Sequence, residues 1–249
     1  MKYLEVREFS TITQALNFET SGENKVSGRL EAYSCKSVAA DKKLYKFFEN
    51  KFQEDLLEAA SLSPEQSLSH IISPFGPLTE SSSRKVLFYL IATLNASFPD
   101  YDFRSIKPEQ FTHEPDVTAV MNDINSTLFT AGNTSAIRRH NMWENVDANI
   151  HLGEASVYSF HPDDDANPFG ENGSIWSLHY FFFNRHLKRV VYFSCTCQSP
   201  TSYSEEDDED SYELTDEYPI TMQFSDVEMS PRTRPLLPEQ SNLYTIKEL

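Results

Sequence analysis

Cysteine is scarce in this sequence, and no apolar run is long enough to cross a bilayer. The 249 residues include three cysteines, Cys35, Cys195 and Cys197, with no CxxC pair. An odd number without paired spacing argues against a disulfide framework or a zinc site, so we expect reduced thiols. A membrane span needs about 20 consecutive apolar residues, and charges follow Met1 too closely for a signal-peptide core. We therefore expect a soluble, intracellular protein with no membrane partner.

Positive charge is the second shortage. The chain has 21 Lys and Arg against 38 Asp and Glu, a formal net charge of −17 at pH 7. Residues 201–249 contain 13 acidic and 3 basic residues, a net of −10, which leaves −7 for residues 1–200. Because binding to a nucleic-acid backbone needs clustered Lys and Arg, we expect no direct nucleic-acid binding. The charge favours a basic protein surface as the partner.

Catalytic and metal-binding motifs are missing as well. No P-loop, Rossmann or nucleophile-elbow pattern occurs, and the seven histidines show no HxxxH or HxH spacing. Asp163, Asp165 and Asn167 match the first three ligand positions of an EF-hand loop, but Pro168 stands at the glycine position and Ser174 where the bidentate Glu belongs. A solvated turn is the favoured interpretation. The sequence thus predicts a binding protein, not an enzyme, without cofactor or metal.

Two alternatives from other classes remain open. Asp100 and Asp102 could form a catalytic pair and, with the acidic run 163–165, serve a metal-dependent hydrolase. Bound metal in a native mass spectrum would support that function, although carboxylates at this spacing after a helix often stabilise a turn. An acidic histone chaperone is the other alternative, and it predicts co-purification with histones.

Hydrophobic periodicity predicts a mixture of helices and strands in one globular domain. Helical spacing covers residues 9–18, 41–60, about 116–129 and about 138–150. Residues 84–98 are apolar nearly all round from Val86 to Leu94, as in a buried helix. Alternating patterns predict strands over residues 25–36 and 155–162. In the first strand we expect Val26, Leu30 and Ala32 on one side and Arg29 and Glu31 on the other.

The stretch 176–195, WSLHYFFFNRHLKRVVYFSC, predicts a central β-hairpin. With Asn184 and Arg185 as the turn, Trp176 would face Phe193, one face would be almost wholly apolar, and the other would be mixed. We expect most of these rings, including Trp176 and Phe193, in the core, because helices are available to cover the sheet. Lys188 and Arg189, near the turn, are candidate partner contacts. An RNA-binding sheet would need more positive charge around it.

Two segments depart from the globular pattern. Residues 61–83 contain eight serines and three prolines and predict a regulatory linker between two parts of the globular domain, 1–60 and 84–199. Residues 200–249 predict an acidic, largely disordered tail. Its acidic run is a candidate partner-binding segment that would steer association toward basic surfaces: Glu205, Glu206, Asp207, Asp208, Glu209 and Asp210.

Four stretches together carry a family resemblance: residues 28–36 (GRLEAYSCK), 83–103 (SRKVLFYLIATLNASFPDYDF), 143–147 (WENVD) and 167–195. In this order they resemble the eukaryotic Maf-type repressor of RNA polymerase III, a family distinct from the leucine-zipper Maf factors. The resemblance implies an α/β (α+β) domain in which helices flank a central, mainly antiparallel sheet. It also implies that a variable, phosphorylated linker interrupts this domain.

The resemblance implies a mechanism too. A repressor of this family binds the polymerase near its clamp and initiation subunits and excludes the promoter-bound initiation factor. Nutrient-responsive protein kinases and a phosphatase control it: the unphosphorylated form is nuclear and repressive, and the phosphorylated form is inactive and more cytoplasmic. Ser63, before Pro64, lies where the family carries linker phosphosites, and Ser73, before Pro74, is the weaker candidate. The linker lacks an Arg-Arg-x-Ser site, which leaves control by a basophilic kinase in doubt.

Overall fold

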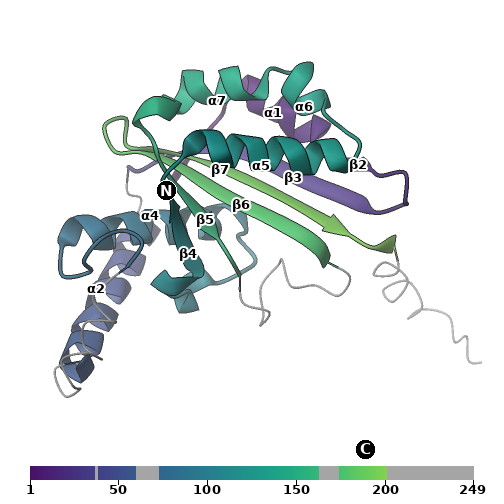
Figure 1. Cartoon of the computed structure of the whole chain (residues 1–249). Coiled ribbons are helices and arrows are strands. Elements are labelled where there is room, and N and C mark those ends of the chain that lie inside the picture. The colour runs from purple at the N-terminus through teal and green to yellow at the C-terminus, as the bar shows by residue number, and fades with distance from the viewer. Residues whose placement is uncertain (37–38, 60–72, 163–173, 201–249) are drawn as a thin grey trace, which may run out of the picture. The chain divides into compact units, whose positions relative to one another are not determined.

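The computed structural model describes residues 1–36, 39–59, 73–162 and 174–200 (Figure 1). The chain divides into two compact units, Met1–Asp207 and Asp208–Leu249, and only the first contains described residues. In this unit an antiparallel sheet carries helices on both faces (Figure 1). The α/β (α+β) class that the sequence predicts is therefore confirmed.

Within the described residues, seven strands form one sheet, and all neighbouring pairs run antiparallel. Their order is β1–β3–β7–β6–β5–β4, and β2 pairs with β3. The short strands β1, β2 and β4 were not predicted, because two to four residues cannot show a period. The strands are β1 (Lys2–Leu4), β2 (Phe18–Glu19), β3 (Lys25–Ser34), β4 (Phe111–Glu114), β5 (Ser156–Phe160), β6 (Ser174–Asn184) and β7 (Arg189–Gln198).

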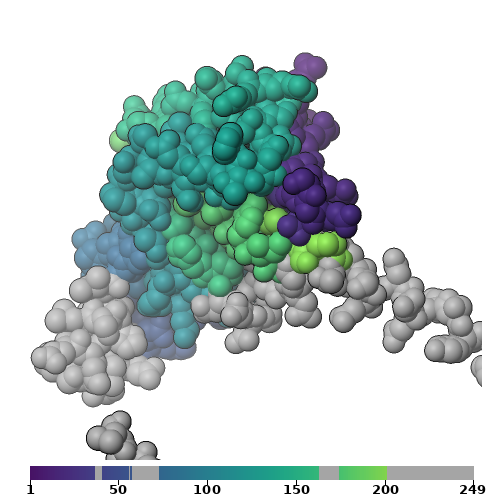
Figure 2. Space-filling view, turned by 45° about the vertical axis from the view of Figure 1, so that its right-hand side comes forward, coloured from purple at the N-terminus to yellow at the C-terminus, as the bar shows by residue number. Residues whose placement is uncertain are grey.

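The helices form one layer on each face of the sheet (Figure 1). In Figure 2 the teal helices of the first layer are packed over the green strands. Within the described residues, no helix is both long and apolar enough to cross a membrane. The first layer contains α1 (Arg7–Ala15), α5 (Val117–Thr130), α6 (Ser135–Arg138) and α7 (Met142–Ile150), and the second contains α2 (Ala39–Ala59) and α4 (Ser81–Ser97).

Each layer closes a separate hydrophobic core against the sheet, and the alternation in β3 shows how. Val26, Leu30 and Ala32 enter the first core, beneath α1, α5 and α7. Tyr33 enters the second core, beneath α4. This is the alternation that the sequence predicts, because successive side chains of a strand point to opposite faces.

The β6–β7 hairpin has a different register from the expected one. Asn184 pairs with Arg189, so four residues form the loop, and Trp176 lies opposite Cys197 instead of Phe193. Because the partner of Trp176 moves by four residues, an even number, every side chain keeps its expected face. Phe193 is buried in the first core as expected. Trp176 is only partly buried and packs against that core, so its placement as a core residue was wrong.

Helix α4 is buried nearly all round, as its apolar sequence predicts. It lies between the sheet and α2, where the Tyr45 ring meets Phe88 edge-on with centroids 5.2 Å apart. The helix ends at Ser97, because Pro99 disfavours helical backbone at Phe98. It begins at Ser81, so the last three residues of the expected linker, 81–83, are helical.

Candidate functional site: a basic loop between β6 and β7

The four residues that connect β6 to β7 form an exposed, basic loop. Arg185, His186, Leu187 and Lys188 are all exposed, and Leu187 exposes 41% of its surface. Within the described part of the chain, none of the four takes part in an ion pair. Two cations beside an apolar side chain can bind a carboxylate and an apolar group of a protein partner at the same time.

Hydrogen bonds from three segments hold this loop in shape. Asn184 is buried, its Oδ1 accepts the Leu187 N–H at 2.9 Å, and its Nδ2 donates to the Ile150 carbonyl at 2.9 Å. Lys188 has a left-handed backbone, with φ of 51°, and its carbonyl accepts the Cys35 N–H at 2.8 Å. The loop therefore keeps one backbone shape before a partner binds, which lowers the entropic cost of association.

The two candidate contacts near the turn have different roles in the structure. Lys188 belongs to the exposed loop, whereas Arg189 turns back and donates from Nη1 to the Asn149 carbonyl at 2.7 Å. Arg185 was expected in the turn but not as a candidate contact, and His186 was expected in a strand, because the expected turn was Asn184 and Arg185 alone. A basic run between two β-rich stretches, RHLK at 185–188, was the signal available in the sequence.

The phosphorylation candidate Ser73 lies in a tight turn. Its hydroxyl donates to the Gly76 carbonyl at 2.7 Å and accepts the Phe75 N–H at 3.3 Å. The turn directs the Phe75 ring against Phe111 and Tyr158, at centroid distances of 5.5 and 5.1 Å. Ser63 and the acidic run Glu205–Asp210 lie outside the described residues.

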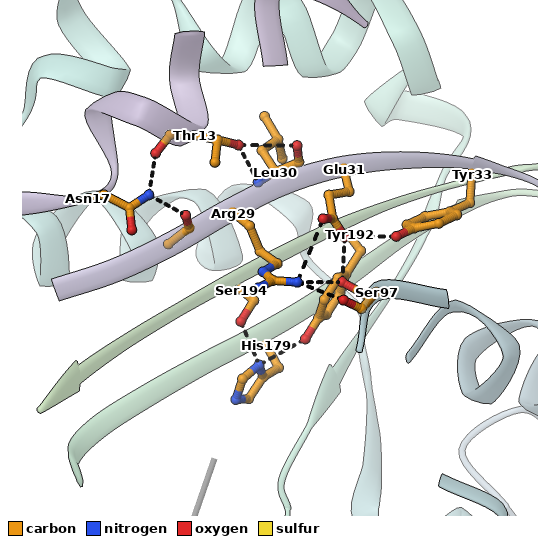
Figure 3. Close-up of polar contacts among 11 residues, drawn as sticks. Thr13, Asn17, Arg29, Leu30, Glu31, Tyr33, Ser97, His179, Tyr192 and Ser194 are labelled. Atoms are coloured by element: carbon orange, nitrogen blue, oxygen red, sulfur yellow. Dashed lines mark hydrogen bonds and ion pairs between the residues drawn. The ribbon is translucent and has the colours of Figure 1, made fainter. Parts of the chain in front are cut away.

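A polar cluster joins β3 to the end of α4 (Figure 3). The Glu31 carboxylate accepts hydrogen bonds from the hydroxyls of Tyr33, at 2.9 Å, and of Ser97. Arg29 donates to the Ser97 carbonyl at 2.7 Å and lies over the Phe98 ring, 4.4 Å from its centroid. Burial and the nearby Glu31 raise the pKa of Tyr33 far above its ordinary value. These groups bond to one another and hold the end of α4 against the sheet, so we assign the cluster a structural role.

His179 of β6 is buried on the same face of the sheet (Figure 3). Its Nδ1 lies 3.1 Å from the Tyr192 hydroxyl and 3.2 Å from the Ser194 hydroxyl. Burial, with a smaller contribution from His161, lowers the pKa of His179 to about 3. The imidazole is therefore neutral at physiological pH.

We expect His179 to make the fold less stable in mild acid. In the unfolded chain the imidazole takes up a proton near pH 6.5, whereas in the folded chain it stays neutral until about pH 3. The unfolded state therefore binds more protons between these values, and stability falls as the pH decreases through this window. Between pH 6 and pH 5 the free energy of unfolding should fall by about 1 kcal/mol.

Urea unfolding at pH 7, 6 and 5 measures this loss. His179→Gln cannot titrate, so its stability should depend less on pH than that of the native chain. His186→Gln is the matched control, because it makes the same substitution in the exposed loop. If His179→Gln keeps the native dependence, another group causes the loss.

Of the two carboxylates considered for catalysis, Asp102 serves local structure. Asp102 accepts the Arg104 N–H at 3.1 Å and pairs with the Arg104 guanidinium. The hydrogen bond from the Arg104 side chain holds the pKa of Asp102 below its ordinary value. The Arg104 backbone N–H and the charge of Arg104 lower this pKa as well. Asp100 is exposed. The Asp102–Arg104 pair stabilises a turn after α4. The acidic run 163–165 lies outside the described residues.

A serine, a histidine and a glutamate lie close together near β4 and β5, but they do not form a catalytic triad. The Ser159 hydroxyl donates to Glu114 at 2.6 Å and lies 3.2 Å from His161 Nε2. In a triad the acid orients the histidine, whereas here Glu114 bonds to the serine itself. In the parts of the chain that the structure describes, no group of three or more His, Cys, Asp and Glu residues could hold a metal ion.

The three cysteines are free thiols, and all are buried. Burial raises the pKa of Cys35 and Cys195 to about 12 and raises that of Cys197 as well. Such thiols are poor nucleophiles at neutral pH, because the thiolate is the reactive form. In this fold the three cysteines therefore pack as small apolar side chains.

Comparison with known proteins assigns the family. Residues 26–194 match a family model described as the Maf1 regulator. The "Repressor of RNA polymerase III transcription maf1" of Schizosaccharomyces pombe is 44% identical over 196 residues, which cover 78% of this chain and 82% of that protein. The "Repressor of RNA polymerase III transcription" of Dictyostelium discoideum is 32% identical over 236 residues and covers 78% of this chain and 84% of that protein.

Solved structures agree with the sequence comparison. A crystal structure of citrus MAF1 superimposes with a TM-score of 0.57 at 32% identity, and the match covers 77% of this chain and 99% of the citrus chain. A second crystal form of the citrus protein gives the same TM-score at 35% identity. The family model extends from β3 into β7 and so includes the basic loop and the polar cluster. This chain belongs to the Maf1 regulator family.

Proposed function

We propose that this protein represses transcription by RNA polymerase III. The observation that carries the proposal is the family match over residues 26–194. Two relatives that are named for this repression also align with this chain over most of their own length. The proposed mechanism is that the protein binds the polymerase near its clamp and initiation subunits. Binding there would prevent the promoter-bound initiation factor from recruiting the polymerase.

The charge of the chain supports an action on the polymerase rather than on DNA. A net charge of −17 opposes association with a duplex backbone. The basic loop, with Lys188 and Arg185 at its surface, offers a contact for polymerase carboxylates. The acidic run Glu205–Asp210 would raise the association rate with basic polymerase surfaces more than the final affinity.

An order-of-addition experiment tests this mechanism. In a reconstituted assay on a tRNA gene, the full chain should inhibit strongly when it is mixed with free polymerase III before the promoter complex is added. It should inhibit much less once polymerase has joined that complex, because recruitment is then complete. Equal inhibition in both orders would place the effect at a later step, and no inhibition in either order would reject the proposal.

We propose further that nutrient-responsive kinases and a phosphatase control the protein through Ser63 and Ser73. A phosphate adds about −1.5 to −2 charges at pH 7. On Ser73 it would remove the hydroxyl proton that bonds to Gly76, and so loosen the turn that directs Phe75 into the second core. The phosphorylated form would be inactive and more cytoplasmic, and the unphosphorylated form nuclear and repressive.

The double variant Ser63→Ala, Ser73→Ala should therefore remain nuclear and repressive in nutrient-rich medium. Precursor tRNA abundance and the position of a fluorescently tagged chain measure the two effects, and the single variants separate the contributions of the two serines. Ser105→Ala is the matched control, because Ser105 is exposed and no proline follows it. Normal recovery of precursor tRNA in the double variant would contradict control through these serines.

A further inference from the structure

An aromatic ring is exposed in the last turn of α5. Phe129 leaves 69% of its surface accessible, more than any other aromatic ring in the described part of the chain. The helix buries Val120, Ile124 and Leu128 on its sheet-facing side. Phe129 follows Leu128 directly, and consecutive helical positions differ by about 100°, so its ring points away from this stripe. The ring contributes little to the core and is available to a partner.

The ring lines a groove between α5 and α6, which we call the α5–α6 groove. Its volume is about 520 Å³, and its walls include Asn125, Phe129, Thr130, Thr134, Ile137 and Arg138. The Trp143 Nε1–H donates to Asn125 Oδ1 at 2.8 Å and so fixes one wall. The groove thus combines two apolar side chains with amide and hydroxyl groups at its rim.

Two adjacent arginines contribute charge at this groove: Arg138 forms part of its wall, and Arg139 follows it in the chain. Arg138 and Arg139 are exposed, and neither forms an ion pair with any residue that the structure describes. Cations are favoured at the C-terminal end of a helix, but α6 has only four residues and its dipole is small. The dipole of α6 could account only for the arginines, and it gives no reason for the exposed ring of Phe129 beside them. Guanidinium groups bind carboxylates with two parallel hydrogen bonds, so the charge and the ring together select an acidic partner with an apolar side chain.

We propose that the α5–α6 groove binds an acidic segment of RNA polymerase III. An apolar side chain of that segment packs against Phe129 and Ile137, and its carboxylates pair with Arg138 and Arg139. A nucleic acid fits less well, because two arginines on a chain of net charge −17 supply little attraction for a phosphate backbone. The proposal rests on the proposed function, in which the polymerase is the partner.

The groove and the basic loop lie far apart on the molecule. Figure 1 shows the loop between β6 and β7 near the end of α7, on the left, and α6 at the opposite end of the same helical layer. Backbone carbonyls at the end of α7, those of Ile150 and Asn149, accept hydrogen bonds from the side chains of Asn184 and Arg189, which flank the loop. Substitutions in the groove therefore leave the loop intact, and each surface can be tested alone.

Binding of the full chain to purified polymerase III, measured by biolayer interferometry, tests the groove. Phe129→Ser and the double variant Arg138→Gln, Arg139→Gln should each weaken binding by about tenfold or more, as truncation of interface anchors does. The control Lys42→Gln, Lys43→Gln removes the same charge from exposed positions on α2 and should bind like the native chain. Melting curves show whether every variant is folded.

The outcomes separate this proposal from the proposed function. If the native chain binds and the folded groove variants bind equally well, the groove proposal is wrong and the proposed function stands. If the lysine control weakens binding as much as the arginine variant, the effect is one of overall charge, which also rejects the groove. If the native chain does not bind the polymerase, both proposals fall.

A photo-crosslink identifies the chemistry of the occupant. With p-benzoylphenylalanine at position 129 of the full chain, irradiation of the polymerase complex should link it to a polymerase peptide that is rich in Asp and Glu and carries an apolar residue. A crosslink to a basic peptide would overturn the proposal. A separate assay offers a labelled tRNA-gene duplex to the protein without polymerase. Binding of this duplex that depends on Arg138 and Arg139 would show that the groove is a nucleic-acid surface instead.

Discussion

Replacing Phe182 with alanine should lower the free energy of unfolding by about 3–5 kcal/mol. Phe182 is fully buried in the first core, opposite Val157 of β5 and Val191 of β7. The Trp143 ring in α7 packs against it edge to face, at a centroid distance of 6.2 Å. Removing the ring leaves a cavity that neighbouring strands and a helix cannot easily close. Because a domain is stable by only about 5–15 kcal/mol, most of the margin would be lost.

Urea unfolding at 25 °C, followed by tryptophan fluorescence, measures this change. Phe129→Ala is the matched control, since it removes the same ring from an exposed position and should change stability by about 0.5 kcal/mol or less. Trp176→Ala should fall between the two, because Trp176 is half-buried. A Phe182→Ala protein as stable as the control would mean that the first core can repack around the missing ring.

Adding a side chain at Gly28 should be nearly as damaging. A Cβ at this position would lie 2.7 Å from Leu16 Cβ and 3.3 Å from Cys195 Sγ. Leu16 Cβ is attached directly to the backbone, so the end of α1 itself would have to move. That end is held in place, because Asn17 Nδ2 donates to the Gly28 carbonyl at 2.8 Å and the Leu30 N–H donates to the Thr13 hydroxyl at 3.0 Å (Figure 3).

We therefore expect Gly28→Ala to cost about 1–3 kcal/mol, as overpacking of a core typically does, and Gly28→Val to cost more. Thermal and urea unfolding of both variants measure the gradation. Gly153→Ala is the control, because no atom lies within 4 Å of a Cβ added there. If Gly28→Ala matched Gly153→Ala in stability, α1 could move at little cost and the close approach would not constrain the fold.

Local periodicity was enough to predict most of the regular structure. The alternation of Val26, Leu30 and Ala32 in β3 and the all-round apolar pattern of α4 each repeat within a few residues, so they are visible without knowing the fold. The same reason explains why the faces of the hairpin were correct although its register was wrong. Side-chain direction depends on local alternation, whereas register depends on the length of the loop.

The loop length was wrong because Asn184 has a tertiary role. An asparagine before an arginine resembles a two-residue turn. In the structure its side chain bridges the Leu187 N–H and the Ile150 carbonyl, and this second contact comes from α7. A turn residue that bonds to a distant helix cannot be recognised from its neighbours in sequence. Arg185 and His186 were therefore not assigned to the candidate site.

The sequence by itself determined the family, the class of fold, in which helices flank a mainly antiparallel sheet, and the acidic character that directs the proposed function to a protein partner. Only the tertiary structure decided which cations are available at the surface: Lys188 is exposed, and Arg189 is bonded to α7. It also decided that Gly28 must lack a side chain and that Phe129 borders a groove with Arg138. The physical reason is that these properties depend on which residues of other elements lie within a few ångströms, and sequence spacing does not specify such contacts.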